Sequence, residues 1–233
     1  CYFFPGNAPI TSFFTYNLNV EHNFIYKCSY SGMSIGWGWC NFDGTGGSQL
    51  PGQPTTTSKF NHVNYNRVEE ICSVLQDAGG IYSLGQQGND DGSEATEMCY
   101  NYINCFRAPT APNNSRMVNG FHPDEGSAFI RFDHNVVTNT IRNVYELDDF
   151  NWMRKHHLTV TNGFSNTDRS TTSAPNCSLE QYVNSDYIWP LEGYEIVLRS
   201  CLEDEYVHMV SKDVMPDDYY ELASNVSITC GGD

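Results

Sequence analysis

VNYNRV, residues 63–68, belongs to a set of five segments that share one pattern around a single position. That position is Asn in four segments and Gly in the fifth. An apolar residue stands three places before it in all five, and another follows two places after it in the first four. The segments are VEHNFI (20–25), VNYNRV (63–68), MCYNYI (98–103), FDHNVV (132–137) and VTNGFS (160–165), which place Asn23, Asn66, Asn101, Asn135 and Gly163 at the shared position.

The pattern predicts short strands that stack in successive coils. Asn and Gly adopt a left-handed backbone conformation more readily than other residues, so their exchange at one position indicates a tight corner. The intervals between the five positions are 43, 35, 34 and 28 residues. This is typical of a solenoid in which loops of different length are inserted on one side. Stacked coils would also bring the Asn side chains into a ladder, with amides hydrogen-bonded from coil to coil.

A second recurrence follows three of the Asn positions and starts with Gly and an apolar residue: Gly32-Met33, Gly80-Ile81 and Gly120-Phe121. These pairs predict a second strand on successive coils. The alternative is a β-sandwich, in which each Asn marks a turn before a strand. Sandwich turns do not normally repeat one residue with the same apolar flanks, which favours the solenoid.

Length and composition limit the classes of function. A chain of 233 residues with 39% hydrophobic content can bury a substantial core. Its formal net charge of −16 repels nucleic-acid phosphates and anionic lipid, so nucleic acid and membrane surfaces are excluded as partners. No apolar run approaches the roughly 20 residues of a membrane span.

Cysteines and sequons indicate a secreted or cell-surface protein. The nine cysteines lack CxxC spacing, which favours disulfides over zinc or thioredoxin-like chemistry. The odd cysteine is either free or joined to another chain. Sequons for N-glycosylation begin at Asn113, Asn176 and Asn225.

Four stretches resemble the right-handed parallel β-helix proteins related to bacterial glycoside hydrolases of the pectin-lyase-like superfold. They are EHNFIYKCSYSGMSIGWGW, DAGGIYSLG, GFHPDEGSAFIRFDHNVV and SCLEDEYVHMV, and together they span about residues 17 to 210. The resemblance implies an all-β fold, a right-handed parallel β-helix with loop insertions over residues 1–170. Because the repeat fades there, we expect residues 171–233 to form a small, partly helical cap over the last coil, held by Cys177, Cys201 or Cys230. Family members carry more residues before the first motif, so the N-terminal coils are expected to be absent, abbreviated or outside this chain.

The resemblance also assigns a sugar site. It implies that Asp77 of DAGGIY and Asp124 and Glu125 of PDEGS are catalytic, because glycoside hydrolysis uses one protonated and one ionised carboxyl group. Equivalent residues on adjacent coils lie roughly 4.8 Å apart, which would place these carboxyl groups in one cleft. The aromatic side chains expected to bind sugar rings on the same face are Trp37, Trp39, Tyr82 and His122.

Each of these residues also has a structural explanation. Asp124 and Glu125 suit the capping of a turn before Gly126. Trp37 and Trp39 suit packing under the insertion at 41–58, and His122 suits a hydrogen-bonded structural role. No cofactor or metal is predicted: the loop Asn89–Glu94 is a weak calcium candidate, and a solvated loop is the simpler interpretation.

Two functions follow. The first is a secreted carbohydrate-active protein that binds polysaccharide and, if active, hydrolyses it with paired carboxylates. The alternative is a non-catalytic structural glycoprotein of an extracellular filament or sheath. Its subunits would stack through the β-helix ends or join through an intermolecular disulfide.

Overall fold

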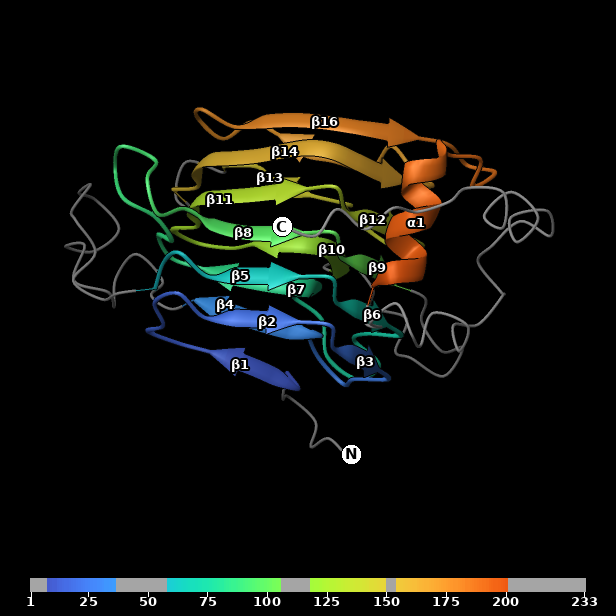
Figure 1. Cartoon of the computed structure of the whole chain (residues 1–233), viewed down its shortest axis with the longest axis horizontal. Coiled ribbons are helices and arrows are strands. Elements are labelled where there is room, and N and C mark those ends of the chain that lie inside the picture. The colour runs from blue at the N-terminus through green and yellow to red at the C-terminus, as the bar shows by residue number, and fades with distance from the viewer. Residues whose placement is uncertain (1–7, 37–57, 106–117, 150–153, 201–233) are drawn as a thin grey trace, which may run out of the picture.

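The computed structural model describes residues 8–36, 58–105, 118–149 and 154–200. Within these ranges the chain is mostly β, and every strand pair is parallel (Figure 1). The expected all-β class is therefore confirmed, and the antiparallel β-sandwich does not fit. The elements are β1 (Ile10–Ser12), β2 (Asn19–Glu21), β3 (Phe24–Tyr26), β4 (Met33–Gly36), β5 (His62–Asn64), β6 (Arg67–Glu69), β7 (Ala78–Leu84), β8 (Thr96–Cys99), β9 (Tyr102–Asn104), β10 (Val118–Pro123), β11 (Ala128–Asp133), β12 (Val136–Thr138), β13 (Glu146–Leu147), β14 (His156–Ser165), β15 (Thr171–Thr172), β16 (Ser178–Val183) and α1 (Leu191–Arg199).

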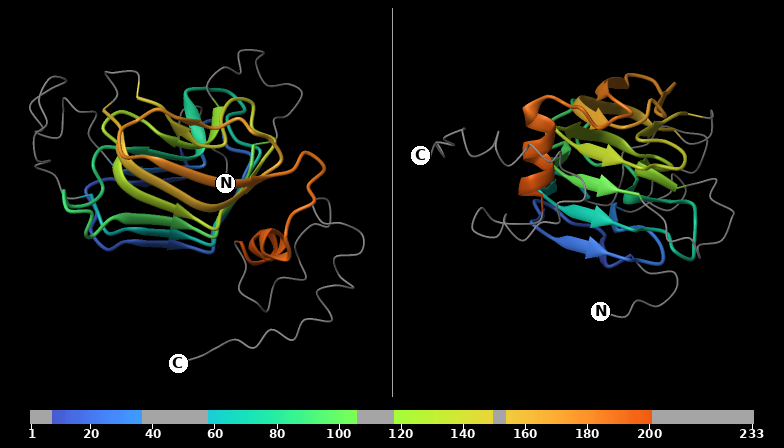
Figure 2. Two further views of the ribbon diagram at one scale, coloured as in Figure 1. Left: turned by 90° about the horizontal axis from the view of Figure 1, so that it is seen from above. Right: turned by 90° about the vertical axis from the view of Figure 1, so that its right-hand side faces the viewer.

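The chain returns to the same three strand positions in the same order. The first position is taken in turn by β1, β4, β7 and β10, which form one sheet. The second and third positions form a larger sheet, in which the long strand β14 joins the row β2-β5-β8-β11 to the row β3-β6-β9-β12. Figure 2 shows the layers nearly superposed when viewed from above. Residues far apart in sequence therefore become neighbours in regular columns.

The Asn positions form the predicted ladder. The Nδ2 of Asn23 donates to Asn66 Oδ1 at 2.9 Å, Asn66 Nδ2 donates to Asn101 Oδ1 at 3.1 Å, and Asn101 Nδ2 donates to Asn135 Oδ1 at 3.0 Å. Each Oδ1 also accepts the backbone N–H of the Asn on the preceding layer, at 2.9–3.1 Å. The apolar flanks of the repeat are buried in the core, as the pattern requires: Val20, Ile25, Val63, Val68, Met98, Ile103, Phe132, Val137 and Val160.

The left-handed residue at this corner is not the Asn, which corrects the sequence interpretation. The residue before each shared position has the positive φ, for example 55° at Tyr65 and 56° at Tyr100. The Asn side chain must lie in the column to bond both neighbouring layers, so the preceding residue makes the turn. Those residues stack in their own column, with ring centroids of His22, Tyr65, Tyr100 and His134 separated by 4.9–5.1 Å.

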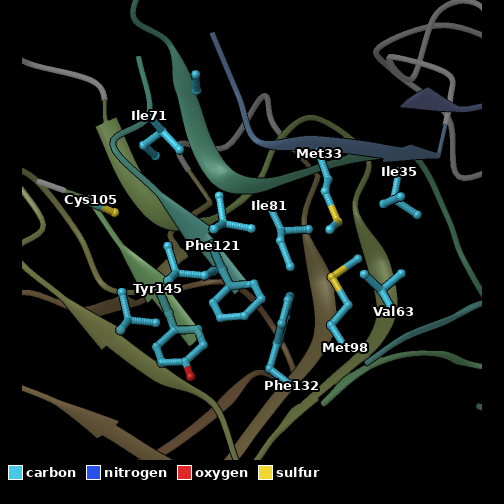
Figure 3. Close-up of a cluster of buried hydrophobic side chains, with 14 of the residues drawn as sticks. Met33, Ile35, Val63, Ile71, Ile81, Met98, Cys105, Phe121, Phe132 and Tyr145 are labelled. Carbon is cyan, nitrogen blue, oxygen red and sulfur yellow. The ribbon is translucent and has the colours of Figure 1, made fainter. Parts of the chain in front are cut away.

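The Gly-apolar pairs lie on adjacent strands, as predicted. Met33 pairs with Ile81, and Ile81 pairs with Phe121. Their side chains fill the space between the two sheets together with Phe132 and Tyr145 (Figure 3). Met33, Ile81 and Phe121 therefore form one continuous line of core side chains from β4 through β7 to β10.

The glycines before these residues let the two sheets approach closely. A Cβ at Gly32 would lie 2.4 Å from Val68 Cγ1, one at Gly80 would lie 2.3 Å from Ile103 Cγ2, and one at Gly120 would lie 2.4 Å from Val137 Cγ1. Real Cβ atoms do not tolerate such contacts. Glycine is thus required at these three positions because each faces the buried apolar residue that stands two places after an Asn of the ladder.

We expect Gly80→Ala to lower the free energy of unfolding by about 2–3 kcal/mol, because the added methyl overpacks the core against Ile103. Urea denaturation measures the loss. The double variant Gly80→Ala/Ile103→Ala should be more stable than the sum of the two single effects predicts. Strict additivity of the two effects would contradict the contact.

The C-terminal part continues the stack before it becomes helical. β15 pairs with β13 and β16 pairs with β14, so strands extend to residue 183. The helix α1 lies along the flank of several layers (Figures 1 and 2), where it packs on Tyr102, Val136 and Phe164. Arg67 Nη1 donates to the carbonyl of Val197 at 3.3 Å. The remainder of the cap expected over 171–233 lies outside the described residues from residue 201 onward, and with it Cys201 and Cys230.

Candidate functional site

One row of buried side chains crosses the sheet that contains β7 and β10. Tyr82 of β7 pairs in register with Ser34 of β4 and His122 of β10. Glu146 of β13 comes next, since Phe121 bridges to Tyr145. The tight parallel register therefore brings an aromatic ring, an imidazole and a carboxylate from three separate segments into one line.

The turn PDEGS places Asp124 beside this row. The turn is closed by a backbone bond from Ser127 N to Asp124 O at 3.0 Å, and Gly126 has a φ of 74°. A second backbone bond, from Asp124 N to Ser83 O at 2.9 Å, ties the turn to the neighbouring strand β7. The side chain of Asp124 is used elsewhere: its Oδ2 accepts a 2.6 Å hydrogen bond from the Tyr82 hydroxyl. This bond fixes the direction of the carboxylate, and burial together with Asp124 raises the pKa of Tyr82 so that the phenol keeps its proton.

Asp77 lies on the same face, immediately before β7. Its φ is 64°, and its carbonyl oxygen accepts a 2.8 Å hydrogen bond from the Tyr30 hydroxyl. The side chain reaches solvent, but partial loss of hydration raises its pKa, and the charge of Asp124 raises it further against the opposing effect of His122. Asp77 and Asp124 are thus electrostatically coupled across 47 residues of sequence.

Glu125 completes the set of carboxyl groups that the sequence singled out. Partial burial raises its pKa, and the neighbouring charge of Asp124 adds to the effect. The structure therefore joins Asp124 to Tyr82 by a hydrogen bond and couples it electrostatically to Asp77, whereas Glu125 is coupled to its sequence neighbour Asp124.

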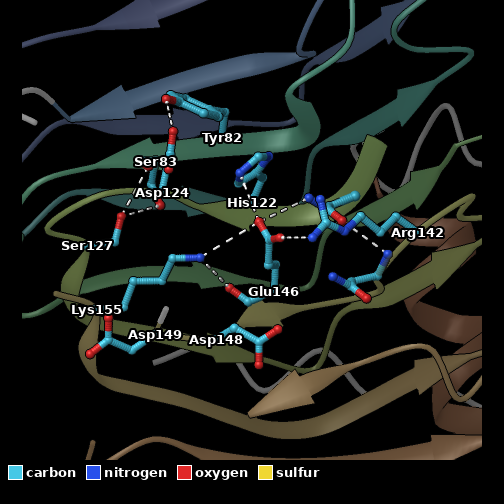
Figure 4. Close-up of polar contacts among 12 residues, drawn as sticks. Tyr82, Ser83, His122, Asp124, Ser127, Arg142, Glu146, Asp148, Asp149 and Lys155 are labelled. Carbon is cyan, nitrogen blue, oxygen red and sulfur yellow. Dashed lines mark hydrogen bonds and ion pairs between the residues drawn. The ribbon is translucent and has the colours of Figure 1, made fainter. Parts of the chain in front are cut away.

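A buried charge cluster underlies this surface (Figure 4). Glu146 accepts contacts from His122 Nε2 at 2.9 Å, Arg142 Nη2 at 3.3 Å and Asn119 Nδ2 at 3.3 Å. Lys155 Nζ donates to the Glu146 carbonyl at 3.1 Å and lies 3.7 Å from its carboxylate. Glu146, His122 and Lys155 are each at most 1% exposed, so the carboxylate of Glu146 and the ammonium of Lys155 must compensate one another inside the protein.

The cluster decides the ionisation of Glu146. Burial alone would raise the pKa of this carboxyl, but the hydrogen bond from His122 and the charges of His122, Lys155 and Arg142 outweigh burial and hold the pKa at about 2. Burial lowers the pKa of Lys155 despite its proximity to Glu146. Glu146 is therefore ionised at neutral pH, and it fixes the orientation of His122 through Nε2.

Sequence reasoning missed Glu146 and Lys155. The one signal for Glu146 is a charged residue inside the apolar run Val144–Leu147, where a core strand position would normally be apolar. Lys155 lies in the basic stretch Arg154–His157, which gives no indication of a buried partner. Their pairing depends on a contact that only the folded chain makes.

The other residues that the sequence singled out do not contribute to this region in the described part of the chain. Trp37, Trp39, Asn113 and Asn225 lie outside the described residues. Asn176 is exposed, and its Nδ2 is 3.1 Å from His157 Nε2. A pocket of about 310 Å³ lies beside Asn176 on the larger sheet, and its lining does not include Asp77, Asp124 or Glu125.

The acidic loop Asn89–Glu94 directs its carboxylates at protein groups. Glu94 binds Lys59 Nζ and the Tyr16 hydroxyl, each at 2.6 Å, and Asp91 accepts from Ser93 N at 2.9 Å. In the described ranges, no group of three His, Cys, Asp or Glu side chains is arranged to hold a metal ion. Likewise, no described helix has the length and apolar character needed to cross a bilayer. No disulfide links any two of the five described cysteines, Cys28, Cys72, Cys99, Cys105 and Cys177.

Comparison of the chain with protein-family models, with curated proteins and with solved structures gave no match to any of them.

Proposed function

We propose that the chain is a right-handed parallel β-helix of the pectin-lyase-like kind. The proposal is supported by the return of the chain to the same three strand positions in layer after layer, and by the Asn ladder that connects these layers. Parallel strands joined by crossover connections are right-handed in about 98% of cases, which gives the hand of the coil. Residues 1–170 would form the β-helix proper, and residues 171–233 would form its C-terminal segment.

We propose that this β-helix acts on or binds polysaccharide, as a secreted protein. The observation that supports the proposal best is the Asp124 carboxylate, which accepts the hydrogen bond of the Tyr82 hydroxyl and whose charge helps to raise the pKa of Asp77. Glycoside hydrolysis needs a carboxylic acid that keeps its proton and a carboxylate that acts as base or nucleophile. A raised pKa suits Asp77 to the first role, and the fixed orientation of Asp124 suits it to the second.

The buried cluster supports these roles from beneath. The Tyr82 ring meets the His122 ring edge-on, with centroids 5.3 Å apart, and His122 is held by Glu146. Asp124, Tyr82, His122 and Glu146 thus form a connected series from the surface to the interior. Tyr82 and His122 are positioning residues in this proposal, because both are buried, at 6% and 1% exposure, and do not present the rings to sugar that the sequence suggested.

Asp77→Asn and Asp124→Asn should each reduce release of reducing sugar ends from a susceptible polysaccharide by at least about 10²-fold, because each removes an acid–base group. Glu125→Gln tests the third carboxyl group in the same assay. Activity of the unchanged protein should fall as pH rises through the raised pKa of Asp77, since the acid then loses its proton.

The control is Asp168→Asn, an exposed aspartate outside the carboxylate region, which should keep full activity. All variants should unfold at the same denaturant concentration as the unchanged protein, because the replaced side chains reach solvent. Full turnover in both Asp77→Asn and Asp124→Asn would remove these residues from the mechanism.

A structural glycoprotein is the second candidate, and exposed apolar side chains at both ends of the strand stack favour it. At the β2–β3 end, Phe24 and Tyr26 are 56% and 43% exposed. At the β16 end, Tyr182 and Val183 are 46% and 39% exposed. Unpaired parallel edges with apolar side chains can be covered by another subunit stacked head to tail. Electron microscopy of native material would show filaments in this case, and uniform monomers under non-reducing conditions would contradict it.

A further inference from the structure

A second concave site lies on the larger sheet. The pocket of about 310 Å³ has its floor on the outer side of β11 and β14, at Arg131 and Thr159. The loop that contains Asp90 and Asp91 forms one wall, and His157 with Asn176 forms the other. Its volume falls at the lower end of the range of small-molecule sites, about 300–1,000 Å³.

The acidic wall is held rigidly before any ligand arrives. Within the loop, Asn89 N donates to Ser93 O at 2.9 Å and Gly92 N donates to Asn89 O at 2.8 Å. Gln86 Nε2 donates to Asp90 Oδ1 at 2.9 Å. A preorganised wall loses little entropy on binding, which favours affinity.

The opposite side carries an aromatic surface and hydrogen-bond donors. The rings of Phe129 and His157 stack with centroids 4.8 Å apart and an interplanar angle of 13°. Arg131 Nη1 contacts Glu97 Oε1 at 3.2 Å, and the rest of its exposed guanidinium faces the pocket region. Asn176 adds an amide at the rim, fixed by its contact with His157.

This combination selects a particular chemistry. Asp90 and Asp91 line the pocket with carboxylate acceptors, and Arg131 and Asn176 line it with donors, which suits a ligand whose hydroxyl groups both donate and accept. The two aspartates and the net charge of −16 disfavour an anionic ligand. Phe129 is 6% exposed and stacks on His157, so it supports the imidazole at the pocket from behind.

We propose that this pocket binds one or two units of a neutral saccharide, separately from the carboxylate face of β7 and β10. The choice of a saccharide as ligand rests on the proposed function. If the protein acts on polysaccharide, the pocket would hold a distant part of the same chain or a second chain.

Isothermal titration with neutral oligosaccharides of two to six glucose, xylose or mannose units tests the proposal. All proteins carry Ser178→Ala, which removes the Asn176 sequon and keeps the Asn176 side chain. Arg131→Ala should raise the Kd of the bound oligosaccharide at least tenfold, and Thr159→Trp, which fills the floor, should abolish binding. Arg169→Ala is the matched control, because Arg169 is also exposed and makes one hydrogen bond, at 2.8 Å to Ile141 O, outside the pocket.

The outcomes separate this proposal from the catalytic one. Binding that survives in Asp77→Asn/Asp124→Asn but is lost in Arg131→Ala supports the pocket, whether or not the protein hydrolyses the sugar. Binding lost only in Asp77→Asn/Asp124→Asn overturns the pocket and leaves the carboxylate site in place. Failure of every neutral oligosaccharide to bind, or preference for a uronic-acid oligomer of equal length, also overturns it. If Thr159→Trp does not fold, the comparison of Arg131→Ala with Arg169→Ala decides.

Discussion

Replacing Asn101 with Ala is expected to lower the free energy of unfolding by about 4 kcal/mol, because a fully buried side chain with four hydrogen bonds is removed. Asn101 Oδ1 accepts from Asn66 N at 3.0 Å and Asn66 Nδ2 at 3.1 Å. Its Nδ2 donates to Val63 O at 2.8 Å and Asn135 Oδ1 at 3.0 Å. The variant leaves Asn66 N and Val63 O buried without these partners, and each such group costs about 1–3 kcal/mol.

The matched control is Asn23→Ala at the end of the same ladder. Asn23 Nδ2 donates to Glu21 O and to Asn66 Oδ1, but this side chain is partly exposed, so water replaces much of the loss. We expect a change below about 1 kcal/mol for Asn23→Ala. Urea denaturation of both variants, analysed with a common slope, measures the difference. Equal losses at the two positions would mean that burial in the column does not determine the strength of the ladder.

Glu146→Gln is expected to cost about 3–5 kcal/mol, the usual penalty for removing one partner of a buried ion pair. The variant keeps the shape of the side chain but leaves the charges of Lys155 and Arg142 without their anion. It also removes the charged acceptor of His122 Nε2. Denaturant unfolding at neutral pH measures this effect, and Glu180→Gln on the exposed side of β16 is the control.

The pH dependence of the same variant gives an independent test. The pKa of Glu146 is about 2 in the folded protein and 4.5 as an ordinary glutamate. A depressed carboxyl pKa contributes stability that is complete above the ordinary value and is lost as pH falls through the folded value. The stability gap between the unchanged protein and Glu146→Gln should therefore shrink by roughly 3 kcal/mol between about pH 5 and pH 2. A gap that stays constant over this range would show that Glu146 is not ionised in the folded protein.

The buried cluster also constrains how the candidate sugar site can be altered. His122 was expected to present a ring to sugar, yet it is 1% exposed and bound to Glu146. Substitutions at His122 should therefore change stability together with any activity. Asp77 and Asp124 are the better tests of chemistry, because their side chains reach the surface.

The sequence by itself determined the stacked parallel strands, because each layer repeats the same local requirements. Each Asn of the ladder is flanked by buried apolar residues three places before it and two places after it. Gly32, Gly80 and Gly120 leave room for the apolar residues that follow an Asn. These requirements recur within six residues, so they are visible as a motif. The strand register does not align Asp77 with Asp124 as the repeat suggested, because Asp77 precedes the first residue of β7 and Asp124 follows the last residue of β10.

Only the tertiary structure decided the charges beneath the site and the second pocket. Glu146 meets His122 across 24 residues, and Arg131, His157 and Asn176 converge from separate strands and loops. The lengths and paths of the inserted loops set these contacts, and no repeated pattern encodes them. The conformation of the corner is also decided by the tertiary structure. The energetic cost of a left-handed backbone at Tyr65 or Tyr100 is offset by the hydrogen bonds of the Asn that follows, and these bonds form only between stacked layers.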